Sequence, residues 1–188
     1  MSRDEKSAAA LRQTSRNAKQ AYEAYTDPVY RDVPADEKLV WAMSTIIYCD
    51  MTRYIIACYE SESEGIASML WMGDFLSKLH EAEHWYKKKG GKLLLDIAER
   101  CGVLQEIKSR LKEINSEYPI DDIKQYRDYR NKMSSHYDHD ALEQLKLFSE
   151  SDGESFYDMM RSFVRYSHRW AELAKQVIEG TVTADELP

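Results

Sequence analysis

Apolar residues recur every three or four positions along most of this chain, which is the spacing of one buried face of an α-helix. The repeat is weak over residues 4–25, where alanine, arginine, glutamine and glutamate dominate, and it is stronger further along. Asp36 stands where the N-cap of a second helix belongs, and Gly90-Gly91 stands where a third helix would end. A fourth helix is expected to bend at Gly102. The helices predicted in this half of the chain cover residues 4–25, 36–59, 66–89 and 94–114.

The C-terminal half continues the helical period. Residues 120–137 form one predicted helix, and two capping boxes follow it, Asp140-Ala-Leu-Glu143 and Ser151-Asp-Gly-Glu154. An apolar stripe over 156–177 predicts the last long helix, and residues 181–188 are expected to form a loose tail. No stretch alternates apolar and polar residues as a half-buried strand does. The sequence therefore predicts one all-α domain over residues 1–188, with an N-terminal helix within 1–26 and an up-and-down bundle of about five to seven helices.

Composition and charge narrow the class of protein. With 43% hydrophobic and 31% charged residues but only 7 Gly and 4 Pro, the chain is expected to fold by itself. A net charge of −7 argues against a broad basic surface, so any contact with nucleic acid has to be local. The three cysteines follow no disulfide or metal-ligand spacing, and neither a signal peptide nor a membrane span is recognisable. These features predict a cytoplasmic protein that has no membrane partner.

The segment His80-Glu-Ala-Glu-His84 satisfies the zinc-protease pattern H-E-x-x-H. A spacing of four places both imidazoles on one helical face, where His80, Glu81 and His84 could share a metal ion. The sequence identifies no third protein ligand, and it has no second Glu-x-x-His to complete a di-iron bundle site. A metal-binding bundle is therefore the weaker alternative, and no cofactor is predicted. The simpler interpretation makes these histidines, and also His168, polar residues at the border of an apolar stripe.

Two further features have a structural interpretation. Asp50 interrupts an apolar face, where a carboxylate needs a partner, so we expect an ion pair with an arginine or a hydrogen bond to a tyrosine. Arg161, Arg165 and Arg169 recur at helical spacing and are interpreted as a solvated helix face.

The most informative polar segment is Tyr129-Arg-Asn-Lys-Met-Ser-Ser-His136-Tyr-Asp138. In a continuous helix Arg130 and His136 would lie about 120° apart, so the two side chains do not share a face by spacing alone. The capping box at Asp140 predicts that the helix ends near His136, which would let the imidazole turn towards the guanidinium, or towards its counterpart across a dimer. Arginine offers a fixed fork to a phosphate, and histidine titrates near neutral pH. The pair therefore suits phosphodiester chemistry that requires no metal.

Arg130-Asn131 followed after four residues by His136, near the end of a helix in an all-α bundle, resembles the R-x(4–6)-H signature of HEPN proteins. The flanking residues, from Tyr129 to Asp138, are similar to the abortive-infection group of bacterial HEPN proteins. The resemblance implies a homodimer with two R/H pairs facing one cleft. In active members it also implies an endoribonuclease that leaves a 2′,3′-cyclic phosphate. Arg130 would then stabilise the phosphorane, Asn131 would position the phosphate or the histidine, and His136 would act as general base or acid.

The same resemblance implies partners. RNA is the expected substrate, and Arg127, Lys132 and Tyr137 are the neighbouring residues expected to contact it. An antitoxin or a nucleotidyltransferase is the expected protein partner, in a prokaryotic defence or toxin–antitoxin system. Because some HEPN proteins have lost catalysis, a non-catalytic interaction or nucleotide-binding module of the same fold is the main alternative.

Overall fold

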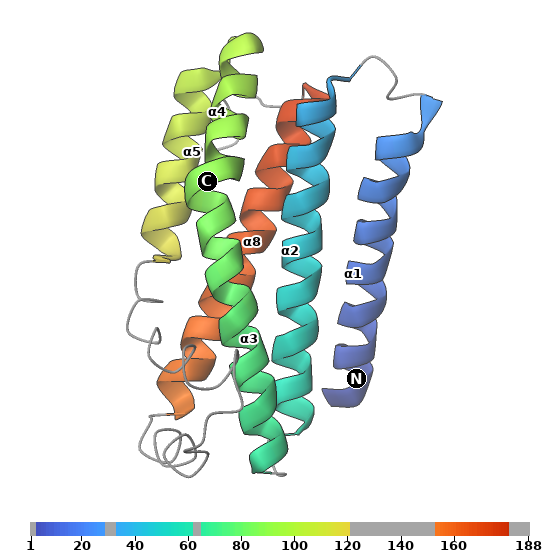
Figure 1. The fold of residues 1–188 in the computed structure, drawn as a ribbon, viewed down its shortest axis with the longest axis vertical. Coiled ribbons are helices and arrows are strands. Elements are labelled where there is room, and N and C mark those ends of the chain that lie inside the picture. Colours follow the sequence, from blue (N-terminus) through green and yellow to red (C-terminus); the bar gives the residue numbers. More distant parts are fainter. Residues whose placement is uncertain (1–2, 29–32, 62–64, 121–152, 181–188) are drawn as a thin grey trace.

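A computed structural model describes residues 3–28, 33–61, 65–120 and 153–180, and these residues form helices joined by short connections (Figure 1). The described part contains no β-strand, which confirms the prediction of an all-α bundle. None of its helices is both long enough and apolar enough to cross a bilayer. The elements are α1 (Arg3–Thr26), α2 (Ala35–Glu60), α3 (Ile66–His84), the π-helical segment η3 (Trp85–Gly90), α4 (Gly91–Arg100), α5 (Leu104–Glu117) and α8 (Gly153–Glu179).

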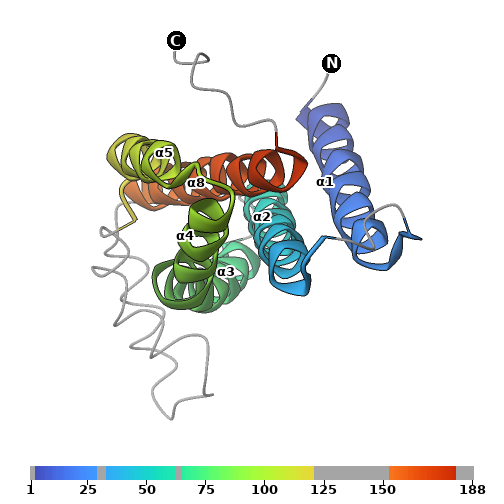
Figure 2. The same cartoon turned by 90° about the horizontal axis from the view of Figure 1, so that it is seen from above.

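Helix α2 lies at the centre of the bundle and packs against α1, α3 and α8 (Figure 2). It begins at Ala35 after Pro34, and no side chain caps its first turn. The prediction that Asp36 is the N-cap is therefore wrong by two positions. Asp36 and Glu37 lie instead within the first turn, where a negative charge interacts favourably with the helix dipole.

The chain passes from α3 into α4 without interruption, so the prediction that Gly90-Gly91 ends a helix is wrong. The N–H of Gly91 donates to the carbonyl of Tyr86, which is the hydrogen bond of a π-helical turn. A Cβ on Gly90 would lie 2.5 Å from the Trp85 ring, and one on Gly91 would lie 2.6 Å from the Tyr86 carbonyl oxygen. The two glycines are required by close packing and do not terminate the helix. The chain turns instead at Gly102, which has a left-handed φ of 76° and separates α4 from α5.

The core lies between α2, α3, α4 and α8, and aromatic side chains fill its centre. Trp170 of α8 is fully buried and contacts both Trp85 and Tyr86, with ring centroids 5.4 and 5.0 Å apart. Aromatic pairs in such tilted arrangements add to the stabilisation from burying their apolar area. Helix α1 packs along α2: Ala10 and Leu11 contact the main core, and Ala21 forms a separate small cluster with Trp41. Tyr22 of α1 is exposed.

Candidate functional site

The residues that the sequence singles out for catalysis lie between α5 and α8, in the segment 121–152. This segment is outside the described residues, so the structure does not test the placement of these side chains. The positions concerned are Arg127, Arg130, Asn131, Lys132, His136 and Tyr137. The described chain does show where the segment is attached, because Ile120 is buried in the main core just before it and α8 begins just after it.

The predicted histidine pair lies near the end of α3, and the structure gives each histidine different surroundings. His80 Nδ1 lies 3.7 Å from Glu83 Oε2, and the Glu83 carboxylate also accepts a 2.9 Å hydrogen bond from Lys87. His84 and Glu81 line a cavity between α2 and α3 instead. Within the described ranges, no three or more His, Cys, Asp or Glu side chains are grouped so that they could hold a metal ion.

The cavity between α2 and α3 has a volume of about 420 Å³ and a mostly apolar lining that also includes charged residues. Asp50 is one of these charged residues, and its carboxylate accepts a 3.0 Å hydrogen bond from Arg53. An ion pair with an arginine is one of the two arrangements expected for Asp50, and the structure shows it. The lining consists of Met43, Ile46, Ile47, Asp50, Met51, Lys78, Glu81, Ala82, His84, Trp85 and Lys89.

A second pocket, of about 310 Å³, lies on the outer surface of α8. We call it the arginine–tyrosine pocket, and its lining consists of Tyr48, Tyr118, Val164, Arg165, His168 and Arg169. Three elements build it, because Tyr48 comes from α2, Tyr118 follows the last turn of α5 and the other residues belong to α8. Helices α5 and α8 lie side by side in both views (Figures 1 and 2). Aromatic rings and guanidinium groups therefore share one concave surface.

The basic groups of this pocket are only loosely neutralised. Arg169 Nη1 lies 3.9 Å from the Glu172 carboxylate, and His168 Nε2 lies 3.6 Å from it, so both contacts are longer than hydrogen bonds. Arg165 has no ion-pair partner among the residues that the structure describes. Exposed pairs at such distances contribute little to stability. The pocket consequently offers positive charge that an anionic ligand can bind without breaking a strong contact.

The tyrosines face these charges. The Tyr118 hydroxyl donates a 2.6 Å hydrogen bond to Glu117, which raises the pKa of this phenol, while the nearby charges of Arg165 and Arg169 oppose that rise. The ring of Tyr48 lies 4.9 Å from the His168 ring at an interplanar angle of 53°. This contact forms the boundary with a smaller pocket of about 190 Å³ between α1, α2 and α8, which Tyr48 and His168 also line.

This pocket was not predicted from the sequence. Arg165 and Arg169 were interpreted as a solvated helix face and His168 as a border residue, and neither tyrosine was singled out. A usable signal was present, because positions 165, 168 and 169 place three nitrogen-rich side chains on one helical turn. The aromatic half of the pocket comes from distant parts of the chain, and no local spacing indicates it.

No known protein-family model matches the sequence, and comparisons with curated proteins and with solved structures found no significant similarity.

Proposed function

We propose that this protein is a metal-independent endoribonuclease of HEPN type that acts as an RNA-targeting toxin in a prokaryotic defence or toxin–antitoxin system. The observation that carries the proposal is Arg130-Asn131 followed after four residues by His136. The all-α bundle is the kind of fold in which such a motif is expected, and the motif falls in the connection between α5 and α8.

The proposed reaction uses the 2′-hydroxyl of the substrate as nucleophile. His136 accepts the proton of this hydroxyl, and the 2′-oxygen attacks the adjacent phosphorus. Arg130 donates two hydrogen bonds to the phosphoryl oxygens, on which negative charge grows in the transition state. The bond to the 5′-oxygen then breaks, and this leaving group takes a proton from a protonated histidine, which the second copy of the motif would supply. The products are a 2′,3′-cyclic phosphate and a 5′-hydroxyl end.

The proposal includes a homodimer, because one chain carries only one Arg130/His136 pair. Exposed apolar side chains on α2 and α3 support an association of this kind. Ile46, Leu70 and Trp71 are 46%, 61% and 41% exposed, and the Trp71 ring lies 6.2 Å from that of Tyr54. Light scattering at micromolar concentration should give twice the mass of one chain, 22.0 kDa. A monomer under these conditions would contradict the shared cleft.

The test of the activity is an RNA cleavage assay with the purified protein in excess EDTA. Cleavage should continue, and end-group analysis should find a cyclic phosphate on the upstream fragment. Loss of cleavage in EDTA with recovery on adding zinc would overturn the proposal, and would favour a metal site at His80, Glu81 and His84.

The second candidate function is a non-catalytic interaction module, and the cavity between α2 and α3 favours it. At about 420 Å³ this cavity lies within the range of small-ligand pockets, roughly 300–1,000 Å³, and apolar residues dominate its lining. Two results together would support the interaction module over the ribonuclease. The wild-type protein would show no RNA cleavage, and Ile46→Glu would abolish binding of a partner that the wild type binds.

A further inference from the structure

The arginine–tyrosine pocket contains the two kinds of group that a nucleotide needs. Guanidinium groups bind phosphate oxygens through paired N–H donors, and aromatic faces stack on any base. Arg165 and Arg169 supply the first kind, while Tyr48, Tyr118 and His168 supply the second. None of the residues that line the pocket is acidic, although the chain as a whole carries a charge of −7.

The shape of the pocket limits the ligand. A volume of about 310 Å³ has room for one nucleotide unit and is too small for a duplex. Val164 is the apolar residue of the lining, and Arg165 and Arg169 are exposed to solvent. Tyr48 and the pocket residues of α8 are held by the packing of α2 against α8, and Tyr118 directly follows the last turn of α5, which also packs against α8.

We propose that the arginine–tyrosine pocket binds one phosphorylated nucleotide unit, with its phosphate between Arg165 and Arg169 and its base against Tyr118. The unit comes either from a single-stranded RNA or from a free nucleotide. The RNA source rests on the proposed function. In the sequence, Tyr118 precedes the segment that carries Arg130 and His136.

Glu172 is the competitor of the phosphate in this arrangement. Its carboxylate lies 3.6 Å from His168 and 3.9 Å from Arg169, and it is half-exposed. A phosphate that binds Arg169 would displace this loose contact. Removing the carboxylate charge should therefore strengthen binding, whereas removing the guanidinium groups should weaken it.

The test is fluorescence anisotropy with a labelled 2′-O-methyl RNA oligonucleotide, which binds but cannot be cleaved through its 2′-oxygen. The variant R165A/R169A should lose affinity by at least roughly tenfold, the loss expected when hydrogen bonds to a charged group are removed. Its salt dependence should fall by about 0.7 in the slope of log K against log salt, because one phosphate contact is lost. E172Q should tighten binding several-fold, while E179Q, further along the same helix, should change nothing.

Two variants of Tyr118 distinguish stacking by its ring from hydrogen bonding by its hydroxyl. Y118F keeps the ring and should bind like the wild type, whereas Y118A should lose affinity by roughly 5–150-fold, the range for one base stacked on an aromatic side chain. The control for charge is K88A/K92A, which removes two exposed positive charges from residues that do not line the pocket. Equal losses in K88A/K92A and R165A/R169A would overturn the proposal, as would normal binding by R165A/R169A with an unchanged circular dichroism spectrum.

Competition for the labelled oligonucleotide distinguishes a single-stranded RNA from a free nucleotide as the source of the bound unit. Displacement of the oligonucleotide by AMP or UMP at similar concentrations would identify a free-nucleotide site, and displacement only by longer RNA would identify a strand site. Either result supports the pocket, but equal displacement by poly-glutamate would overturn it. Because the probe is not cleaved, this binding experiment stands even if no ribonuclease activity is found.

Discussion

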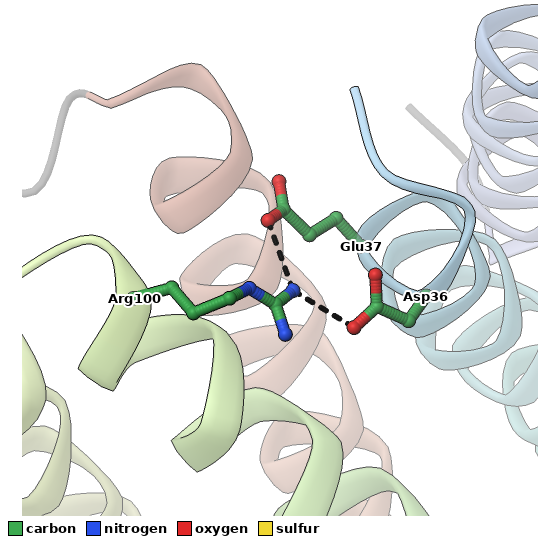
Figure 3. A network of polar contacts seen from close by, with 3 residues as sticks. All are labelled: Asp36, Glu37 and Arg100. Carbon is green, nitrogen blue, oxygen red and sulfur yellow. Dashed lines mark hydrogen bonds and ion pairs between the residues drawn. The ribbon is translucent and has the colours of Figure 1, made fainter. Parts of the chain in front are cut away.

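Arg100 Nη2 lies 2.8 Å from Asp36 Oδ2, which joins the last turn of α4 to the first turn of α2 (Figure 3). The same nitrogen lies 3.2 Å from Glu37 Oε1, so one guanidinium holds two carboxylates. These hydrogen bonds to Asp36 and Glu37 raise the pKa of Arg100. The Glu37 side chain is only 11% exposed, and without Arg100 its charge would lose this partner in a largely enclosed place.

Arg100→Ala should lower the urea midpoint of unfolding, and Asp36→Ala should lower it less, because Glu37 would keep its partner. The decrease in the urea midpoint should be smaller in 1 M salt, where the Debye length is only about 3 Å and the attraction between the charges is weaker. Lys92→Ala, an exposed position in the same helix, is the matched control and should leave the midpoint unchanged. An effect of Arg100→Ala that does not depend on salt would show that packing, and not the ion pair, is responsible.

Gly91→Ala should destabilise the protein by about 1–3 kcal/mol, although alanine favours a helix over glycine by about 1 kcal/mol. The reason is the 2.6 Å approach of its Cβ to the Tyr86 carbonyl oxygen. Urea unfolding checks the value, and a stabilised Gly91→Ala protein would contradict the π-helical turn.

Gly102 should also be intolerant of alanine, but for a different reason from Gly91. A Cβ there would meet nothing within 4 Å, but its φ of 76° is unfavourable for alanine. Asparagine tolerates this conformation, so Gly102→Asn should recover much of the stability that Gly102→Ala loses. Gly91→Asn should recover none, because the clash remains.

Stability should fall as the pH rises above about 9. Burial raises the pKa of Cys49 to about 11 and that of Cys58 to about 12, from an ordinary value of 9.0. Between these values the unfolded chain has lost protons that the folded chain retains, so the unfolded state is favoured as pH increases. Burial also raises the pKa of Tyr86 and Tyr166, which extends the decline above pH 10. Urea midpoints at pH 7, 9 and 10 measure this decline, and Cys58→Ala should make it shallower.

Loss of the proposed catalytic groups should abolish RNA cleavage while the helical spectrum stays intact. Removing a positioned general base lowers a rate by about 10²–10⁴, which is the loss expected for His136→Ala. Arg130→Ala should lose about 10²–10³, and Arg130→Lys should also fail because lysine offers no fork. His80→Ala and His84→Ala are the matched histidine controls and should keep full activity. Cleavage that survives His136→Ala would refute the mechanism.

The sequence alone determined the features that depend on neighbours within a few residues. Backbone hydrogen bonds link residues four apart, so the apolar period predicted the all-α class and the approximate ranges of α1, α2 and α8. It predicted one helix over 94–114, whereas the structure divides this stretch between α4 and α5. The arginine partner of Asp50 was predictable for the same reason, because Arg53 lies one turn away. The motif from Arg130 to His136 is also local, and it was recognised from adjacent residues.

Only the tertiary structure decided the features that bring distant residues together. Gly90-Gly91 has the sequence of a helix end, but the packing of the Trp85 ring and the π-helical hydrogen bond to Tyr86 continue the helix through it. The ion pair of Arg100 with Asp36 spans 64 positions. The arginine–tyrosine pocket likewise needs α2, α5 and α8 to pack at particular positions along one another. Such positions follow from the fit of many side chains in the core at once, and no single spacing in the sequence encodes them.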